Sequence, residues 1–394
     1  YVTQWYPKPA VYDNSGWHAM PFLNQGEFYS EFGSFDVSIT LPANYVVGAT
    51  GQLQDNPAEE AWMDSLAAVT PTFMMNAGRL DAFPPSSLRM KTLRFKQDHV
   101  HDFAWFADKR YEVRKGEVTL PRSGRTVTTW TLFTPGNALL WADAVTELNE
   151  SVRLYSQWVG DYRDASCTAV DGTIAAGGGM EYPMITIIGN AYSRFELDDV
   201  IAHEVGHNWF YGMLASNERD HPWMDEGINS FFEQRYLETR YPGRRGYDVE
   251  GVPIGFLTGD KGINQREQNE LIYRYNARRN WDSPTGSTST AFTEFGYDAS
   301  VYAKSALIFD QLFHDLGAAR FDSCTHAYFD ALDWKHPQPA DVQASYEKAS
   351  GKDLNWCFGE LIGTADKVDV KARRLNADQL TYLSTAVEGF PFPI

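Results

Sequence analysis

The first third of the chain alternates apolar and polar residues in short runs, a pattern that predicts β-strands. The clearest run places apolar side chains at every second position, as in a strand with one buried face (Phe35, Val37, Ile39 and Leu41). We expect β structure over 27–53 and strand-like runs again over 88–133. The acidic stretch 55–64 between them is expected to be a loop or a surface helix.

After Gly136 the apolar positions change to helical spacing. They recur at steps of three and four residues, which predicts an amphipathic helix (Leu140, Ala144, Leu148, Val152 and Tyr155). A glycine-rich turn at 177–179 leads to a short apolar run at 184–188 that is typical of a strand. The remaining predicted elements are helices at 197–214, 224–241 and 300–316, shorter helices to about 362, and a strand at 367–372, with a weakly patterned stretch at 243–295. The pattern therefore predicts an α+β chain, first rich in strands and then mainly helical.

The helix predicted at 197–214 contains the motif His-Glu-x-x-His, at His203, Glu204 and His207. Residues at i and i+4 lie on one helix face about one turn apart, so both imidazoles can reach one metal ion. Glu204 projects beside them, where it can take a proton from a metal-bound water. The next predicted helix carries Glu226 in the sequence Trp-Met-Asp-Glu-Gly. A third ligand there completes a His₂Glu site with one open position, so we expect one catalytic Zn²⁺ ion.

The spacing of these ligands resembles one family. Eighteen residues separate His207 from Glu226, and this spacing with the Trp-x-x-Glu-Gly context is similar to the gluzincin aminopeptidases, the family of alanyl aminopeptidase and the leukotriene hydrolase. Thermolysin-type enzymes share the ligands but typically have one residue more before the glutamate. The resemblance implies a mature or trimmed fragment of a longer member. Its parts would be the end of an N-terminal β-sheet domain at 1–117, a mainly helical thermolysin-like catalytic domain at 118–365, and the start of a further β segment at 366–394.

A second motif lies upstream of the metal ligands. The run Gly178-Gly179-Met-Glu181-Tyr182 resembles the Gly-x-Met-Glu-Asn motif of the family, in which the glutamate binds the free α-amino group of the substrate. The resemblance assigns that role to Glu181, and a carboxylate at a fixed distance from the metal would measure off one residue. Gly178 and Gly179 let a substrate backbone approach closely. Tyr182 stands where the family usually has Asn.

A third motif lies downstream. Val-Tyr302-Ala-Lys-Ser305 resembles the Val-Tyr-x-Lys-Gly segment of the family, which implies that Tyr302 donates a hydrogen bond to the oxyanion of the tetrahedral intermediate. Ser305 replaces the usual glycine, and Tyr297 is expected to line the pocket. Three polar residues around the third ligand are expected either to orient the histidine ligands or to face solvent (Asp225, Asn229 and Glu233).

Composition excludes some partners. With 34 basic and 52 acidic residues the net charge is −18, which argues against nucleic acid. No apolar run reaches the length of about 18 residues that spans a bilayer, so no membrane span is expected. The three cysteines are too few and too scattered for a disulfide framework and are expected to be buried (Cys167, Cys324 and Cys357). An extracytoplasmic location, periplasmic or secreted, is expected rather than a cytoplasmic one.

The expected activity is hydrolysis of the N-terminal peptide bond of peptides with a free N-terminus, with Glu204 acting as general base and then as general acid. Three alternatives stay open: a zinc endopeptidase or dipeptidase, an epoxide-type hydrolase on the same scaffold, and a non-catalytic peptide-binding module. Retention of both histidines, Glu204 and Glu226 weighs against the last. An aminopeptidase should lose N-acetylated substrates, whereas an endopeptidase should not.

Overall fold

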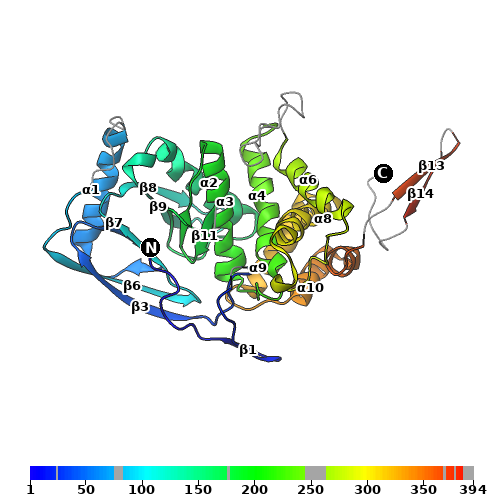
Figure 1. Cartoon of the computed structure of the whole chain (residues 1–394), viewed down its shortest axis with the longest axis horizontal. Coiled ribbons are helices and arrows are strands. Elements are labelled where there is room, and N and C mark those ends of the chain that lie inside the picture. The colour runs from blue at the N-terminus through cyan, green and yellow to red at the C-terminus, as the bar shows by residue number, and fades with distance from the viewer. Residues whose placement is uncertain are drawn as a thin grey trace. The chain divides into compact units, whose positions relative to one another are not determined.

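A computed structural model describes most of the chain, and these residues form two compact units (Figure 1). The described ranges are 1–23, 25–74, 83–174, 178–244, 263–366, 370–376 and 379–384. Unit 1 comprises 1–20, 29–215 and 333–335. Unit 2 comprises 21–28, 216–332 and 336–394.

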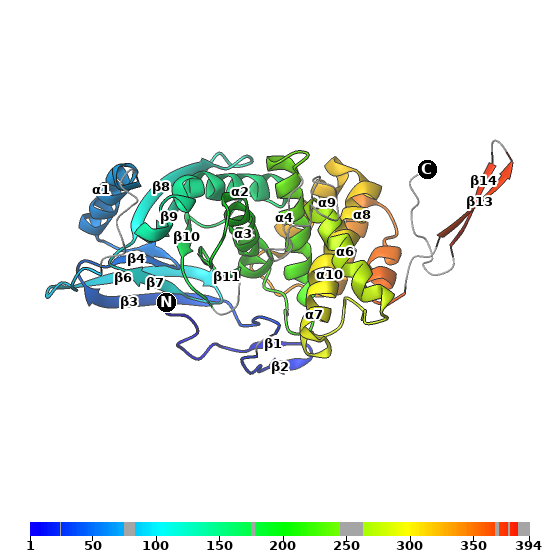
Figure 2. The same cartoon turned by 45° about the horizontal axis from the view of Figure 1, so that its top comes forward.

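Antiparallel strands form the first part of unit 1 (Figure 2), with the bounds β1 (Val11–Asp13), β2 (Gly16–His18), β3 (Gly33–Pro42), β4 (Val46–Ala49), β5 (Gln52–Leu53), β6 (Met90–Val100) and β7 (Trp105–Asp108). β3 confirms the predicted alternation, because Ile39 and Leu41 are buried while Ser38 and Thr40 face solvent. In the sheet β3-β6-β5 all pairs are antiparallel, and β4 pairs with β7. These strands bury a small apolar core around Phe103.

A five-stranded sheet and two helices complete the larger core of unit 1, with the bounds β8 (Glu112–Thr119), β9 (Thr126–Phe133), β10 (Ser166–Asp171), β11 (Gly179–Tyr182), β12 (Ile185–Ile188), α2 (Ala144–Trp158) and α3 (Arg194–His207). The strand order is β11-β12-β10-β9-β8. The central pairs β9·β10 and β10·β12 are parallel, whereas both edge strands are antiparallel. α2 packs against β8, β9 and α3, and α3 packs against β11 and β12, so the sheet edge and the metal-motif helix are direct neighbours.

Residues 57–64 of the acidic stretch lie in a helix, α1 (Pro57–Met74), so of the two alternatives the surface helix is confirmed there. Asn56 precedes the helix and its side chain accepts a hydrogen bond from the Glu59 amide at 3.1 Å, which satisfies a free donor of the first turn. Trp62 and Met63 pack against the core of the five-stranded sheet. Because the stretch is rich in acidic residues, its sequence pattern gives little indication of this apolar face.

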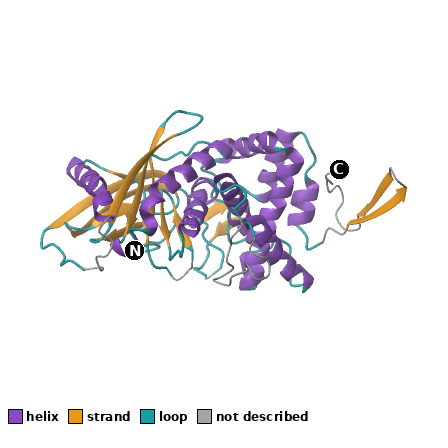
Figure 3. Ribbon diagram, turned by 90° about the horizontal axis from the view of Figure 1, so that it is seen from above, coloured by secondary structure: helices purple, strands orange, loops and turns teal. Residues whose placement is uncertain are grey.

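Unit 2 is mainly helical (Figure 3), with the bounds α4 (Glu226–Arg240), α6 (Gln265–Arg278), α7 (Glu294–Tyr297), α8 (Ser305–Leu316), α9 (Ala318–Leu332), α10 (Pro339–Ser350), β13 (Val370–Asn376) and β14 (Gln379–Ser384). Its core includes phenylalanine rings in tilted and edge-to-face contact, with 5.1 Å between the Phe231 and Phe321 centroids. α6 lies in the weakly patterned stretch 243–295, where Asn264 and Glu267 form a reciprocal capping box at its start.

The predicted α+β fold class is confirmed. Of the strand predicted at 367–372, residues 367–369 lie outside the described ranges and β13 begins at Val370. The domain limit at 117/118 falls inside β8 and stays a prediction from the family resemblance.

All three cysteines are buried and none forms a disulfide. Across the ranges that the structure describes, no helix combines the length and apolar character needed to cross a membrane.

Candidate functional site

The helix that carries the metal motif has a defined start and end. At its start the Ser193 side chain accepts a hydrogen bond from the Glu196 amide at 3.1 Å, and the Glu196 carboxylate accepts one from the Tyr192 amide at 2.7 Å. These bonds satisfy donors that the first turn leaves free. The α-helix ends at His207, and the chain continues as a π-helical turn, η3 (Asn208–Met213), where a single helix to 214 was predicted.

Residues just after the motif fix the end of the helix to the rest of unit 1. The Asn208 side chain donates to the Val205 carbonyl at 3.0 Å and accepts from the Met184 amide, just before β12, at 2.9 Å. The indole of Trp209 donates to the Gly160 carbonyl at 2.8 Å. The last turn of α3, which carries the motif, is therefore held against the sheet by buried hydrogen bonds.

The two histidines of the motif converge. The Nε2 atoms of His203 and His207 lie 3.1 Å apart, with His207 buried and His203 half-buried. Two nitrogen ligands about 2.0–2.1 Å from a tetrahedral ion would be about 3.3 Å apart. The separation and the donor chemistry thus fit a shared metal ion.

Two carboxylates lie beside this pair within unit 1. Oxygens of Glu181 and Glu204 and a ring nitrogen of His207 all lie within 4.8 Å of one another. Glu181 is 4% exposed and Glu204 is 5% exposed. Glu181 projects from β11, a strand at the sheet edge, so its position is set by the ladder with β12 rather than by a loop.

The glycines before Glu181 differ in their surroundings. A Cβ on Gly179 would lie 2.3 Å from Oε1 of Glu204, so only glycine leaves that carboxylate its observed position. A Cβ on Gly178 would meet nothing nearer than Val200, at 3.7 Å. Gly177 lies outside the described residues. The substrate-binding role of Gly178 and Gly179 stays a prediction.

Tyr182 points away from the candidate site. Successive residues of a strand face opposite sides, so Tyr182 and Glu181 do not share a face. Tyr182 is 6% exposed and belongs to the apolar core of unit 1, with its ring centroid 6.1 Å from that of Phe106. The replacement of the usual Asn therefore changes core packing on the opposite face of the strand.

The remaining predicted site residues belong to unit 2. Glu226 is the first residue of α4 and is 4% exposed. The Tyr302 hydroxyl donates a hydrogen bond to Oε1 of Glu226 at 2.5 Å. Tyr302 lies on a π-helical segment, η6 (Asp298–Lys304), instead of the regular helix predicted from 300. π-Helical turns often occur at functional sites because they re-aim a side chain.

Gly227 lets this hydrogen bond form. A Cβ at Gly227 would lie 2.6 Å from the Cβ of Ser305 and 2.9 Å from the Val301 carbonyl oxygen. The backbone of α4 therefore passes directly against η6 and the start of α8. This close approach brings Glu226 within reach of Tyr302.

Burial and nearby carboxylates keep both tyrosines protonated. Burial raises the pKa of Tyr302 well above its usual value, and the Glu226 carboxylate raises it further. The pKa of Tyr297 is raised in the same way, by burial first and then by Glu226 and Glu27. The Tyr297 ring centroid lies 5.8 Å from that of Tyr302, so Tyr297 packs beside the candidate oxyanion donor.

Glu27 is a functional candidate that sequence reasoning missed. The segment 21–28 belongs to unit 2, where the Gln25 side chain donates to the Ser289 carbonyl and the Phe28 amide donates to Glu218 at 2.9 Å. These contacts bring the Glu27 carboxylate near Tyr297 and Tyr302. No periodicity or motif marks this short polar segment in the sequence.

The polar residues around Glu226 are buried rather than solvent-facing. The exposed fractions are 0% for Asp225, 0% for Asn229 and 8% for Glu233, so the expectation of a solvated helix face is wrong. Glu233 accepts a hydrogen bond from Gln265 at 3.0 Å. A role in orienting the histidine ligands stays a prediction.

Each unit thus assembles part of the predicted site. Unit 1 brings together His203, His207, Glu204 and Glu181, and unit 2 brings together Glu226, Tyr302 and Tyr297. An HExxH helix with converging imidazoles, packed on a mixed sheet, is the arrangement that HExxH metallopeptidases use.

Comparisons with known proteins point to one family. Residues 188–360 match the model of the peptidase family M1 domain. Aminopeptidase M1-A of Oryza sativa subsp. japonica is 21% identical over 205 residues, which cover 48% of this chain and 20% of the relative.

Two solved structures share the fold. The M1 zinc metallopeptidase of Deinococcus radiodurans is similar with a TM-score of 0.55 at 18% identity, covering 82% of this chain and 63% of that one. Aminopeptidase A of Legionella pneumophila, solved in complex with aspartic acid, gives a TM-score of 0.63 at 16% identity, covering 93% of this chain and 39% of that one. The chain therefore spans less than two thirds of the length of each of these relatives.

Proposed function

We propose that this chain is the zinc-binding part of an aminopeptidase, with His203, His207 and Glu226 as the ligands of one Zn²⁺ ion. The converging imidazoles and the match of residues 188–360 to the peptidase family M1 domain support this proposal. Zinc in a His₂Glu site supplies a Lewis acid that polarises the scissile carbonyl and lowers the pKa of a bound water towards about 7.

In this proposal Glu204 moves the proton. It is buried beside His207, where water is scarce and a carboxylate is held in one position. As general base it takes a proton from the attacking water, and as general acid it passes this proton to the leaving amine. Tyr302 donates its hydroxyl proton in a hydrogen bond to the developing oxyanion, and its raised pKa keeps that proton in place.

The exopeptidase assignment rests on one observation, the buried carboxylate of Glu181 beside Glu204 and His207. An ammonium group such as a free N-terminus is a partner that a buried carboxylate binds well. Relatives of this chain are named aminopeptidases. In unit 2 the carboxylates near Tyr297 add negative charge that favours the same end of a peptide (Glu27, Glu218, Asp225 and Glu226).

The test is a paired assay of aminoacyl p-nitroanilides with free and with N-acetylated α-amino groups. Wild type should cleave the free substrate, lose activity with a zinc chelator and leave the acetylated substrate intact. Glu204→Gln should abolish turnover of the free substrate, whereas the exposed Glu117→Gln serves as the matched control and should behave as wild type. Equal turnover of acetylated and free substrates would exclude the aminopeptidase, and full activity of Glu204→Gln would exclude the proposed proton transfer.

Glu181→Gln separates amine recognition from chemistry. We expect the KM for free substrates to rise by about 10- to 100-fold, because the variant loses a charge-assisted contact in a buried site.

Cleavage of long acetylated peptides by wild type would favour the endopeptidase, and turnover of an epoxide without peptidase activity would favour the epoxide-type hydrolase. Peptide binding without turnover of either would favour the binding module. An extracytoplasmic location is part of the proposal.

A further inference from the structure

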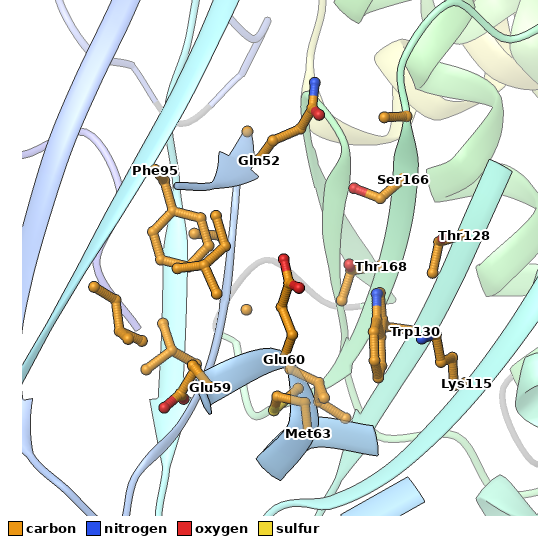
Figure 4. A pocket seen from close by; sticks show the side chains of 18 of the residues that line it. Gln52, Glu59, Glu60, Met63, Phe95, Lys115, Thr128, Trp130, Ser166 and Thr168 are labelled. Carbon is orange, nitrogen blue, oxygen red and sulfur yellow. The ribbon is translucent and has the colours of Figure 1, made fainter. Parts of the chain in front are cut away.

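Unit 1 contains a cavity that none of the candidate site residues line. Its volume is about 330 Å³, and strands β4, β5 and β6 form one wall while β8, β9 and β10 form the other. The first two turns of α1 close it from the side (Figure 4). Small-ligand pockets begin at about 300 Å³, so the cavity is large enough for a ligand of modest size.

The floor of the cavity is apolar and rigid. Leu93 and Phe95 of β6 and Leu132 of β9 line it and are 1%, 6% and 1% exposed. Met63 and Trp130 add an adaptable thioether and a wide aromatic surface. A ligand that fits here must therefore present an apolar body.

The charges around the cavity are unbalanced. Among the charged residues of the lining there are three carboxylates and one ammonium group (Glu59, Glu60, Asp64 and Lys115). Glu59 is paired with Lys91 at 2.6 Å and Asp64 is paired with Lys115 at 2.7 Å. Within the described part of the chain Glu60 has no ion-pair partner.

Glu60 is also aimed at the cavity. Its side chain rises from α1 between Phe95 on one side and Thr168 on the other (Figure 4). The hydroxyl-bearing side chains of Ser166 and Thr168 lie on the opposite wall. An ammonium group between these walls would meet a carboxylate and hydroxyl acceptors at once, whereas an anion would meet the unpaired negative charge.

We propose that this cavity is a binding site for a small organic cation, an amine carried on an apolar or aromatic body. The ammonium group binds Glu60 and the Thr168 hydroxyl, and the body packs on Phe95, Met63 and Trp130. The proposal is independent of the peptidase function, because its lining and the candidate site share no residue.

The test uses phenethylamine as the probe and 2-phenylethanol as its neutral counterpart. Methyl NMR on methionine-labelled protein reports the site, because Met63 is one of nine methionines and its signal is assigned with Met63→Leu. Inhibition of aminoacyl p-nitroanilide hydrolysis by phenethylamine reports binding at the candidate active site. The metal is left in place throughout.

Phenethylamine should shift the Met63 signal and should bind more tightly than the alcohol. Glu60→Gln should weaken phenethylamine binding by about three- to tenfold and leave the affinity for the alcohol unchanged. The expected loss is modest because an ion pair that is partly exposed to solvent contributes little binding free energy. Glu294→Gln removes an exposed first-turn glutamate outside the cavity and should bind as wild type.

Three results would overturn the proposal: no response of Met63 to the amine, equal binding of amine and alcohol, or unchanged amine affinity in Glu60→Gln. Inhibition of hydrolysis by the amine without a response of Met63 would place the amine at the candidate active site. That outcome would overturn the cavity site and leave the proposed peptidase intact.

Discussion

Gly179→Ala tests the link between the strand edge and the proposed catalytic base. The new Cβ would lie 2.3 Å from Oε1 and 2.5 Å from Cδ of Glu204, whereas ordinary Cβ contacts begin at 3.4 Å. The carboxylate must therefore move by about 1 Å, and a misplacement of about 1 Å can lower the rate about 100-fold. We expect kcat to fall by about that factor, which corresponds to about 2.7 kcal/mol of activation free energy.

The assay is steady-state hydrolysis of a free aminoacyl p-nitroanilide, together with zinc content and thermal unfolding. Because the clash is with the Glu204 side chain, from Cγ to Oε1, and not with backbone, the zinc content and the melting temperature should stay close to those of wild type. Gly33→Ala is the matched control, since a Cβ there would meet no atom within 4 Å and Gly33 lies outside the candidate site, and it should keep wild-type activity. If Gly179→Ala retains wild-type kcat, or if both variants lose activity equally, the placement of Glu204 by Gly179 is refuted.

Three further predictions follow from buried contacts. Tyr302→Phe should lower kcat by about 10²- to 10³-fold with zinc content unchanged, because a single oxyanion donor is lost; unchanged kcat would contradict the role. Asp102→Ala should lower the free energy of unfolding by about 3–5 kcal/mol in urea titrations, because the fully buried carboxylate accepts bonds from the N-terminal segment (Gln4, Tyr6 and Lys8), and a loss below about 1 kcal/mol would contradict this. Burial lowers the pKa of Lys304 from 10.5 to about 8. Between these two pH values the unfolded chain binds more protons than the folded chain. This residue therefore makes the free energy of unfolding rise with pH from about 8 towards 10.5. Urea titrations at pH 7.5 to 9.5 should therefore show a smaller pH-dependent gain in Lys304→Met than in wild type, and equal slopes would contradict the assignment.

Several elements could be predicted because their signals are local. The alternation of Phe35 to Leu41 predicts β3, and 126–133 coincides with β9. The start of α6 has a local signal as well, the Asn264 and Glu267 capping box, although the apolar periodicity of that stretch is too weak to indicate a helix by itself. The helix α1 is harder to recognise in the sequence, because only a few apolar side chains, placed among acidic residues, form its buried face.

The interruptions of the two site helices could not be predicted. The apolar spacing of 197–214 continues across His207, yet the α-helix ends there because Asn208 and Trp209 bond to distant backbone groups. The same holds for η6, in which the turn that carries Tyr302 is π-helical. Neither change alters the composition or the apolar pattern of the segment.

The metal ligands and the candidate base can be derived from the chain alone, because an i, i+4 pair on a helix has one geometry whatever surrounds it. Gly179 also stands out in the sequence, but the sequence does not show why glycine is needed there. Only the fold shows that Glu204 occupies the space that a side chain at position 179 would fill. Glu27, the Tyr302–Glu226 hydrogen bond and the Glu60 cavity depend on contacts between residues far apart along the chain. Such contacts are fixed by how helices and strands pack, and packing is set by the shapes of many side chains together rather than by any local pattern.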